Sequence, residues 1–177
     1  MKNQLIPAIT NVKDLEYFLT LNHDICVVMS IHVSMLKRVV ERLKAQTKTV
    51  WLHLDLIPGL SSDEHGAEYA IQYLKVDGIV STKTSAIKAA KKKKITAIFR
   101  IFLIDSASMD KSLARVDEIN PDYVEFLPAL AHRILPIIQD RLHVPVIGGG
   151  LIQTQSDIDD CYAEGMVAVT VSKTNLW

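Results

Sequence analysis

The sequence predicts an α/β protein folded as a (β/α)₈ barrel of the TIM type, with parallel strands and short loops. Eight short apolar runs rich in β-branched residues recur along the 177 residues. Their spacing of about 23 residues is enough for one strand, one helix and two short loops. Stretches with apolar residues at helical spacing separate the runs. Eight runs in strict alternation favour a closed barrel over an open parallel sheet.

The predicted strands are the runs 5–9, 25–31, 49–57, 77–82, 95–104, 123–128, 144–149 and 167–172. The predicted helices lie between them, at 11–20, 34–46, 64–74, 85–94, 107–119, 129–141 and 155–164. Asn11, Ser34 and Thr154 stand where helices begin, and their side chains are of the types that cap a first turn.

The chain has room for one domain, which we place at residues 1–177. A typical barrel of this kind has about 250 residues, so no inserted lid or second domain is expected. No helical stretch follows the eighth run. We therefore expect the last helix to be truncated or absent and the barrel to be open on that side.

Nothing in the sequence predicts export or a membrane anchor. No signal-like apolar stretch opens the chain, and no apolar run approaches the roughly 18 residues of a membrane span. The protein is therefore expected in the cytoplasm, without a membrane partner. Cys26 and Cys161 lack the number and spacing of a disulfide framework or a zinc site, so we interpret them as small buried hydrophobes.

Alternation along the strands predicts which polar side chains face the inside of the barrel. In the third run Val50, Leu52 and their alternating neighbours form an apolar face for the helices, which leaves His53 and Asp55 inside. The same sorting places Ser30, His32, Arg100 and Glu125 inside, and the fourth strand ends in Ser81-Thr82-Lys83. The predicted polar contacts to a ligand at the carboxyl mouth are His53, Asp55, Ser81, Lys83, Arg100 and Glu125.

Two other interpretations of these residues remain open. Arg100 and Glu125 lie on adjacent strands and could simply neutralise each other, because a buried charge is tolerated when it is paired. His32, His53, Asp55 and Glu125 are side chains that divalent metals use, but no HxH or HExxH spacing supports a metal, and none is predicted.

The seventh strand ends in a run of three glycines, Gly148 to Gly150, in a chain with only seven. Glycines let backbone N–H groups approach an anion closely, and barrels often hold phosphate between the loops after strands seven and eight. The eighth strand ends in two hydroxyls around one cation. The alternative is a tight turn with a polar exit. The predicted phosphate-binding residues are Gly149, Gly150, Ser172, Lys173 and Thr174.

The net charge of zero hides a basic segment. Residues 78–104 contain seven Lys and Arg and no acid, so the rest of the chain carries the opposite charge. Its lysines could be a solvated helix end that complements the helix dipole, or a contact for the RNA or DNA backbone. The candidate RNA-binding residues, at the amino-terminal rim of the barrel, are Lys88, Lys91, Lys92, Lys93 and Lys94.

Several short motifs together resemble the glycerol uptake operon antiterminator regulatory proteins of bacteria, over nearly the whole chain. They are Ile31-His32, His53-Leu54-Asp55-Leu56 with Gly59, Gly66-Ala67-Glu68, residues 78–82, residues 100–105, Glu125-Phe126-Leu127-Pro128, the glycine run and residues 172–177. The resemblance implies a barrel-shaped regulator that responds to glycerol 3-phosphate and binds leader mRNA so that transcription passes a terminator. The chain departs from the family pattern at Ser30, where an acid is usual, and at Ala129, where glycine is usual.

Two other functions stay open. The first is an enzyme, an isomerase or aldolase acting on a triose or sugar phosphate, in which Lys83 would form a Schiff base and Glu125 or Asp55 would act as the general base. Short loops argue against it, because they leave little to exclude water. The second is a scaffold without a ligand. We expect a non-enzymatic regulator with no catalytic residues and no cofactor, whose partners are glycerol 3-phosphate and leader mRNA. Formation of a homo-oligomer is left open.

Overall fold

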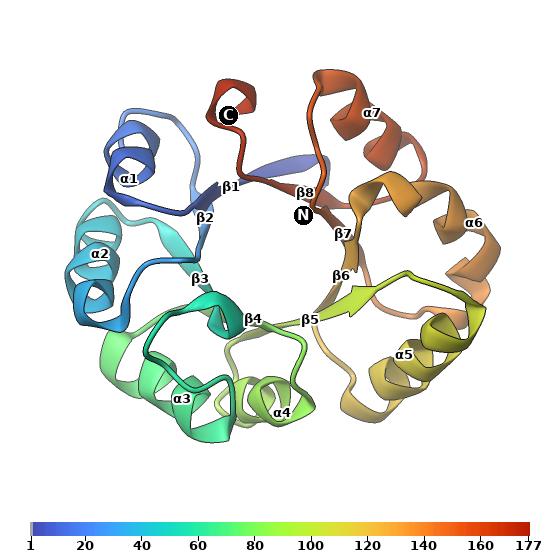
Figure 1. Cartoon of the computed structure of the whole chain (residues 1–177), viewed down its shortest axis with the longest axis horizontal. Helices are drawn as coiled ribbons and strands as arrows, with labels where there is room; N and C mark the ends of the chain where they lie inside the picture. The colour runs from blue at the N-terminus through green and yellow to red at the C-terminus, as the bar shows by residue number, and fades with distance from the viewer. Residues whose placement is uncertain (1) are drawn as a thin grey trace.

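Eight parallel strands form a closed barrel in which each strand pairs with its neighbours in sequence (Figure 1). The computed structural model describes residues 2–177, without the side chain of Gln139. The strands are β1 (Gln4–Ile9), β2 (Ile25–Val28), β3 (Thr49–His53), β4 (Gly78–Ser81), β5 (Thr96–Phe102), β6 (Tyr123–Leu127), β7 (Val146–Gly149) and β8 (Ala168–Val171). The predicted fold class is confirmed.

A ring of helices surrounds the strands (Figure 1). The helices are α1 (Val12–Phe18), α2 (Val33–Ala45), α3 (Glu64–Tyr69), α4 (Thr84–Lys92), α5 (Ser106–Ile119), α6 (Leu135–Ile138) and α7 (Gln155–Ala163). Shorter helical turns are η1 (Leu54–Leu56), η2 (Ala70–Leu74), η3 (Ala129–Ile134), η4 (Gln139–Arg141) and η5 (Thr174–Leu176). Asn11 and Thr154 cap α1 and α7 as predicted.

Apolar side chains pack in two layers. The outer layer, between strands and helices, includes Val50, Leu52, Phe99 and Phe126. The inner layer fills the barrel and includes Ile6, Trp51, Ile98 and Ile147. Gly78 makes room for the indole, because a Cβ there would lie 2.5 Å from Cδ1 of Trp51. Cys26 and Cys161 are buried and unbonded, as predicted.

The expectation of a barrel open beside the eighth strand is wrong. β1 and β8 pair in parallel, with Gln4 opposite Ala168 and Pro7 opposite Val171, and this pairing closes the sheet. β8 is followed by the short turn η5. That turn lies between α1 and α7 in Figure 1.

Two of the predicted strands, β2 and β3, end three and four residues before their apolar runs do. β2 ends at Val28, and the exposed Ser30 takes a left-handed φ of 58°. His32 is also exposed and caps α2 in place of Ser34, so Ser30 and His32 are not inside the barrel. β3 ends at His53, and Asp55 lies in the turn η1. A hydrogen bond joins the loop after β2 to the turn η1 after β3, because the Ser30 N–H donates to the Leu56 carbonyl at 3.0 Å.

The predicted helix at 129–141 is divided into η3, α6 and η4. Pro136 lies in this segment and has no N–H to donate four residues back, to His132. A continuous α-helix over the whole segment would therefore lack one of its hydrogen bonds.

Candidate functional site

A small cavity of about 80 Å³ opens at the carboxyl mouth of the barrel. We call it the mouth cavity. Six strands and the segments after β2, β7 and β8 contribute to its wall, which consists of Ala8, Val27, Met29, His53, Arg100, Glu125, Gly150, Thr170 and Ser172. Five of the predicted ligand residues therefore lie together, namely His53, Arg100, Glu125, Gly150 and Ser172.

The floor of the mouth cavity is a connected set of four polar side chains. Nε of Arg100 lies 3.1 Å from Oε2 of Glu125, and the hydroxyl of Thr170 donates to Oε1 of the same carboxylate at 2.6 Å. The guanidinium also contacts Nε2 of His53. Because arginine can only donate, that nitrogen is the acceptor and the imidazole is neutral.

Burial shifts the protonation of two of these groups. Desolvation and the neighbouring Arg100 lower the pKa of His53 to about 4, which keeps the ring neutral. Burial raises the pKa of Glu125, while Arg100 and the hydrogen bond from Thr170 oppose that rise. Arg100 and Glu125 are thus paired inside the barrel, as one interpretation of the sequence allowed.

The three glycines at the end of β7 serve different purposes. A Cβ on Gly149 would lie 2.5 Å from Oε1 of Glu125 and 2.8 Å from Oγ1 of Thr170, so this glycine makes room for the polar floor. A Cβ on Gly148 would lie 2.7 Å from the sulfur of Met166. Gly150 has a φ of 74° and turns the chain at the cavity wall.

The segment after β8 reaches the cavity only through Ser172. Nζ of the exposed Lys173 donates to the carbonyl of Gln153 at 2.8 Å, which ties this segment to the loop after β7. Thr174 begins η5. Neither Lys173 nor Thr174 is among the residues that line the mouth cavity.

Asp55 and Ser81 form a second polar group that holds the loops after β3 and β4. One carboxylate oxygen of Asp55 accepts from the hydroxyl of Ser81, and the other accepts from N–H and Oγ1 of Thr82 at 2.7 and 2.8 Å. Lys83 follows and is exposed. Asp55, Ser81 and Lys83 do not line the mouth cavity.

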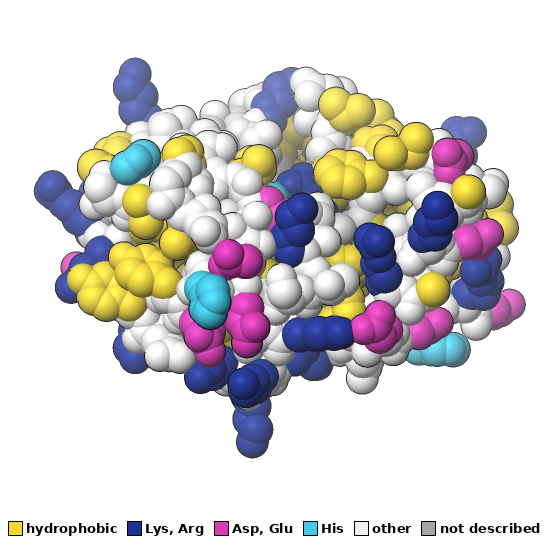
Figure 2. All heavy atoms as spheres, turned by 60° about the horizontal axis from the view of Figure 1, so that its bottom comes forward, with side chains coloured by type: hydrophobic (Ala, Val, Ile, Leu, Met, Phe, Trp, Pro, Cys, Tyr) yellow, Lys and Arg dark blue, Asp and Glu magenta, His cyan; other side chains and the backbone are white. Residues whose placement is uncertain are grey.

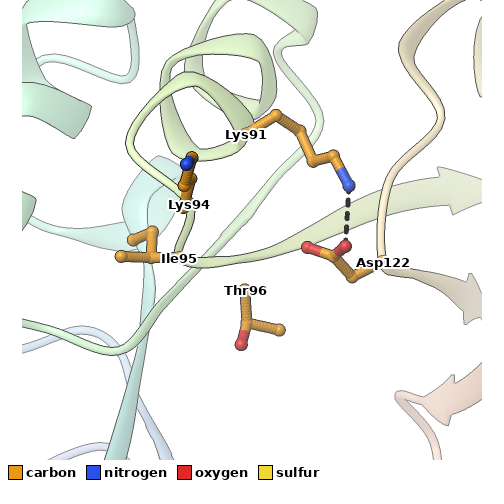
Figure 3. A pocket seen from close by; sticks show the side chains of 5 residues that line it. All are labelled: Lys91, Lys94, Ile95, Thr96 and Asp122. Carbon is orange, nitrogen blue, oxygen red and sulfur yellow. Dashed lines mark hydrogen bonds and ion pairs between the residues drawn. The ribbon is translucent and has the colours of Figure 1, made fainter.

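The predicted lysines lie around the carboxyl end of α4 and the start of β5, at the amino-terminal rim of the barrel. A hollow of about 430 Å³ lies there, and Nζ of Lys91 donates to Oδ1 of Asp122 at 2.7 Å within it. Figure 3 shows the side chains that line this hollow. Lys88 pairs with Glu118 at 2.6 Å, and Lys93 lies 3.8 Å from Glu68. Lys92 and Lys94 are exposed and form no ion pair with any residue that the structure describes.

Thr170, Ala8, Val27 and Met29 line the mouth cavity but were not predicted. Alternation along β8 could have found Thr170, because Ala168 of the same strand faces the barrel interior. Across residues 2–177, His, Cys, Asp and Glu side chains form no group of three suited to a metal ion. Among the described residues, no helix is both long and apolar enough to cross a membrane.

Comparison with known proteins shows the family. Residues 5–177 match the model of the glycerol-3-phosphate responsive antiterminators. The crystal structure of a glycerol uptake operon antiterminator regulatory protein from Listeria monocytogenes is similar with a TM-score of 0.92 and 39% identity, covering 98% of this chain and 94% of that one.

Two further relatives have similar lengths. A glycerol uptake operon antiterminator-related protein from Thermotoga maritima matches with a TM-score of 0.86 and 25% identity, over 100% of this chain and 99% of that one. The uncharacterized protein YgcP of Escherichia coli K12 is 29% identical over 99% of this chain and 92% of its own length. Solved structures of enzymes with 10 to 14% identity show the fold alone. The chain belongs to the family of glycerol-3-phosphate responsive antiterminators, which are regulatory proteins.

Proposed function

We propose that the protein binds glycerol 3-phosphate in the mouth cavity and, in response, binds the leader mRNA of glycerol-utilisation operons so that transcription continues past a terminator. Membership of the family supports a regulator of this kind. Its place of action is then the cytoplasm, where leader mRNA is transcribed, and its ligand is an effector rather than a cofactor.

The polar floor of the mouth cavity is the observation that carries the proposal. Nδ1 of His53 is buried and has no hydrogen-bond partner among the described residues, and the buried Oε2 of Glu125 has the ion pair with Arg100 but accepts no hydrogen bond from them. Buried polar atoms are usually satisfied, and a polyol offers hydroxyl groups that both donate and accept. A cavity of about 80 Å³ has the volume of a few water molecules, so it admits a small polyol and excludes a large ligand.

The phosphate group belongs at the edge of the cavity in this arrangement. Gly150 and Ser172 are the exposed lining residues after β7 and β8, the loops where barrels commonly bind phosphate. Lys173 lies next to Ser172 and adds a positive charge near the same edge. The glycerol portion would then contact Glu125 and His53, with the phosphate outside.

A regulator fits the site better than the enzyme considered as an alternative. The mouth cavity contains no lysine, so its lining offers no amine for a Schiff base. Asp55, the other candidate base, is occupied by Ser81 and Thr82. We therefore propose that the protein binds its phosphorylated ligand without converting it.

Calorimetric titration with glycerol 3-phosphate tests the effector site. We expect Ser172→Ala to weaken binding about tenfold, because a hydrogen bond to a charged group contributes roughly 1.5 kcal/mol or more. Ser85→Ala is the matched control, since Ser85 is an exposed residue of α4 outside the mouth cavity. Equal affinities of the two variants would place the phosphate elsewhere.

The same titration with and without leader RNA tests the response. Linkage requires that the effector tighten RNA binding by the same factor by which RNA tightens effector binding. Binding of glycerol 3-phosphate with no RNA binding in either state would remove the RNA part of the proposal. Turnover of triose phosphates would instead favour the enzyme.

A further inference from the structure

A second cavity of about 240 Å³ lies beside the mouth cavity, between the end of β5 and one face of α5. We call it the β5–α5 groove. Its cations are Arg100, Lys111 and Arg115, and its lining contains no Asp or Glu. Figure 2 shows the α4 and α5 side of the molecule. Dark blue Lys and Arg side chains lie there around an area of yellow hydrophobic side chains.

The groove results from the unequal lengths of neighbouring strands. β4 ends at Ser81, which pairs with Phe99, whereas β5 continues to Phe102 and pairs there only with β6. On α5, Lys111 and Arg115 are separated by one helical turn and share a face. The Lys88–Glu118 pair links α4 to α5.

Two of the three cations of the groove are available to a ligand, because Arg100 is paired with Glu125. Lys111 and Arg115 are exposed and form no ion pair with a described residue. Three acids of α5 and its N-cap have other partners, because Asp105 accepts from the Ser108 N–H, Asp110 pairs with Arg141 and Glu118 pairs with Lys88. Asp117, the remaining acid of α5, does not line the groove.

The groove also has an exposed aromatic ring. Phe102 is 49% exposed, although it lies on a strand of the barrel. The guanidinium carbon of Arg100 lies 5.9 Å from the centre of this ring. Single-stranded nucleic acids are bound by such combinations of cations, which contact phosphates, and aromatic rings, on which bases stack.

We propose that the β5–α5 groove is the surface that binds leader RNA as a single strand, with Lys111 and Arg115 on phosphates and Phe102 stacking on a base. The inference rests on the proposed function, since it names the RNA surface of that regulator. It differs from the sequence prediction, which placed RNA at the lysines of the amino-terminal rim. Three of those five lysines are paired with acids.

The position of the groove explains how an effector would influence RNA. Arg100 lines both the mouth cavity and the groove. Its guanidinium contacts Glu125 and His53 on one side and approaches Phe102 on the other. A ligand that changes the contacts of Arg100 in the mouth cavity therefore changes the surroundings of the Phe102 ring in the groove. Arg100 is the residue through which the two sites are coupled.

RNA affinity of three double variants, measured as a function of salt, tests the proposal. Lys111→Ala with Arg115→Ala removes two cations from the groove, and Lys92→Ala with Lys94→Ala removes two from the rim. Lys75→Ala with Arg133→Ala is the matched control, because it removes one exposed lysine and one exposed arginine found in neither place. Circular dichroism and glycerol 3-phosphate titration check that each variant is folded.

We expect only the groove variant to weaken RNA binding, by about tenfold, and to reduce the salt slope by roughly 1.4, since each phosphate contact on a single strand contributes about 0.7. Phe102→Leu should weaken binding about fivefold or more at every salt concentration through lost stacking. If wild-type protein binds RNA and the groove variant behaves like the control, the groove is not the RNA surface. Loss in the rim variant alone would move RNA to the lysines, and failure of the wild type to bind RNA would contradict the proposed function itself.

Discussion

At the scale of single residues, His53 shows how the barrel interior controls charge. The side chain is 3% exposed and shares its environment with the guanidinium of Arg100. Burial and the neighbouring cation both disfavour a second proton on the ring. A neutral His53 leaves Arg100 as the cation of the polar floor, balanced by Glu125.

The lowered pKa of His53 predicts a loss of stability in acid. Between pH 6.5 and about 4 the unfolded chain binds a proton that the folded chain does not. The free energy of unfolding should therefore fall by up to about 1.4 kcal/mol per pH unit in that range, and level off below it. Above pH 6.5 the ring is neutral in both states, and His53 causes no pH dependence.

Urea unfolding of wild type and His53→Gln across this pH range tests the prediction. The amide oxygen of glutamine can still accept from Arg100 but does not titrate. The raised pKa of Glu125 acts in the opposite direction, stabilising the fold as pH falls, but it is present in both proteins. The difference in free energy of unfolding between wild type and His53→Gln should therefore narrow or reverse as the pH falls from 6.5 to about 4. Parallel plots of stability against pH would show that His53 does not cause the loss of stability in acid.

The sequence predicted inward side chains correctly where the residue lies within a strand. His53, Arg100 and Glu125 obey the alternation of β3, β5 and β6. Alternation failed for Ser30, His32 and Asp55, because their strands had already ended. The left-handed turn at Ser30 and the 3₁₀ turn at Asp55 depend on hydrogen bonds between loops distant in sequence, which a local pattern does not contain.

At the scale of elements, two aspartates fasten the amino-terminal ends of neighbouring strands. Asp77 directly precedes β4 and accepts from the Val50 N–H of β3 at 2.6 Å. Asp122 directly precedes β6 and accepts from the Ala97 N–H of β5 at 2.8 Å. Each carboxylate also pairs with a lysine, Lys44 or Lys91. Each aspartate thus accepts a hydrogen bond from a backbone N–H of the neighbouring strand and also holds a lysine side chain.

The backbone hydrogen bond should matter more for stability than the ion pair. Asp122→Ala leaves the buried Ala97 N–H without a partner, which costs about 1–3 kcal/mol. Asp122→Asn keeps an acceptor oxygen and loses only the partly exposed pair with Lys91, which contributes about 0–1 kcal/mol. We expect urea unfolding to rank the variants in that order, and equal losses would mean that the ion pair dominates.

Helices were predicted best where one apolar stripe runs uninterrupted. The stripe of Leu36, Val39, Val40 and Leu43 is buried in α2, as its spacing indicated. The segment 129–141 has a similar apolar content but contains Pro136, and it forms three short turns. Composition therefore predicted that this segment packs on the barrel, but it did not predict the non-helical backbone at Ala131 or that Pro136 lies in the first turn of a separate helix, where proline is tolerated.

At the scale of the whole molecule, the ends of the described chain meet at one seam. β1 and β8 pair, and the turn η5 follows β8. Leu176 and Trp177 pack against the outer apolar layer. The sequence could not show that strand pairing closes the barrel, because β1 and β8 are far apart along the chain.

Trp177 links this seam to α1. Its indole stacks on Tyr17 of α1 with ring centres 6.0 Å apart, and its Nε1 donates to the Val171 carbonyl of β8 at 2.8 Å. Trp177→Ala should destabilise the fold by about 1–3 kcal/mol through loss of both contacts. At roughly 2–4 °C per kcal/mol for a domain of this size, the Tm should fall by several degrees.

Trp177→Phe separates the two contributions, because phenylalanine keeps a ring beside Tyr17 but cannot donate to Val171. We expect a Tm between those of Trp177→Ala and the wild type. Thermal unfolding with and without glycerol 3-phosphate then shows whether the seam matters for the effector site. Ser172, which lines the mouth cavity, directly follows Val171. Loosening the seam should therefore also lower the affinity for glycerol 3-phosphate. An unchanged effector affinity in Trp177→Ala would show that Ser172 is positioned by β8 alone.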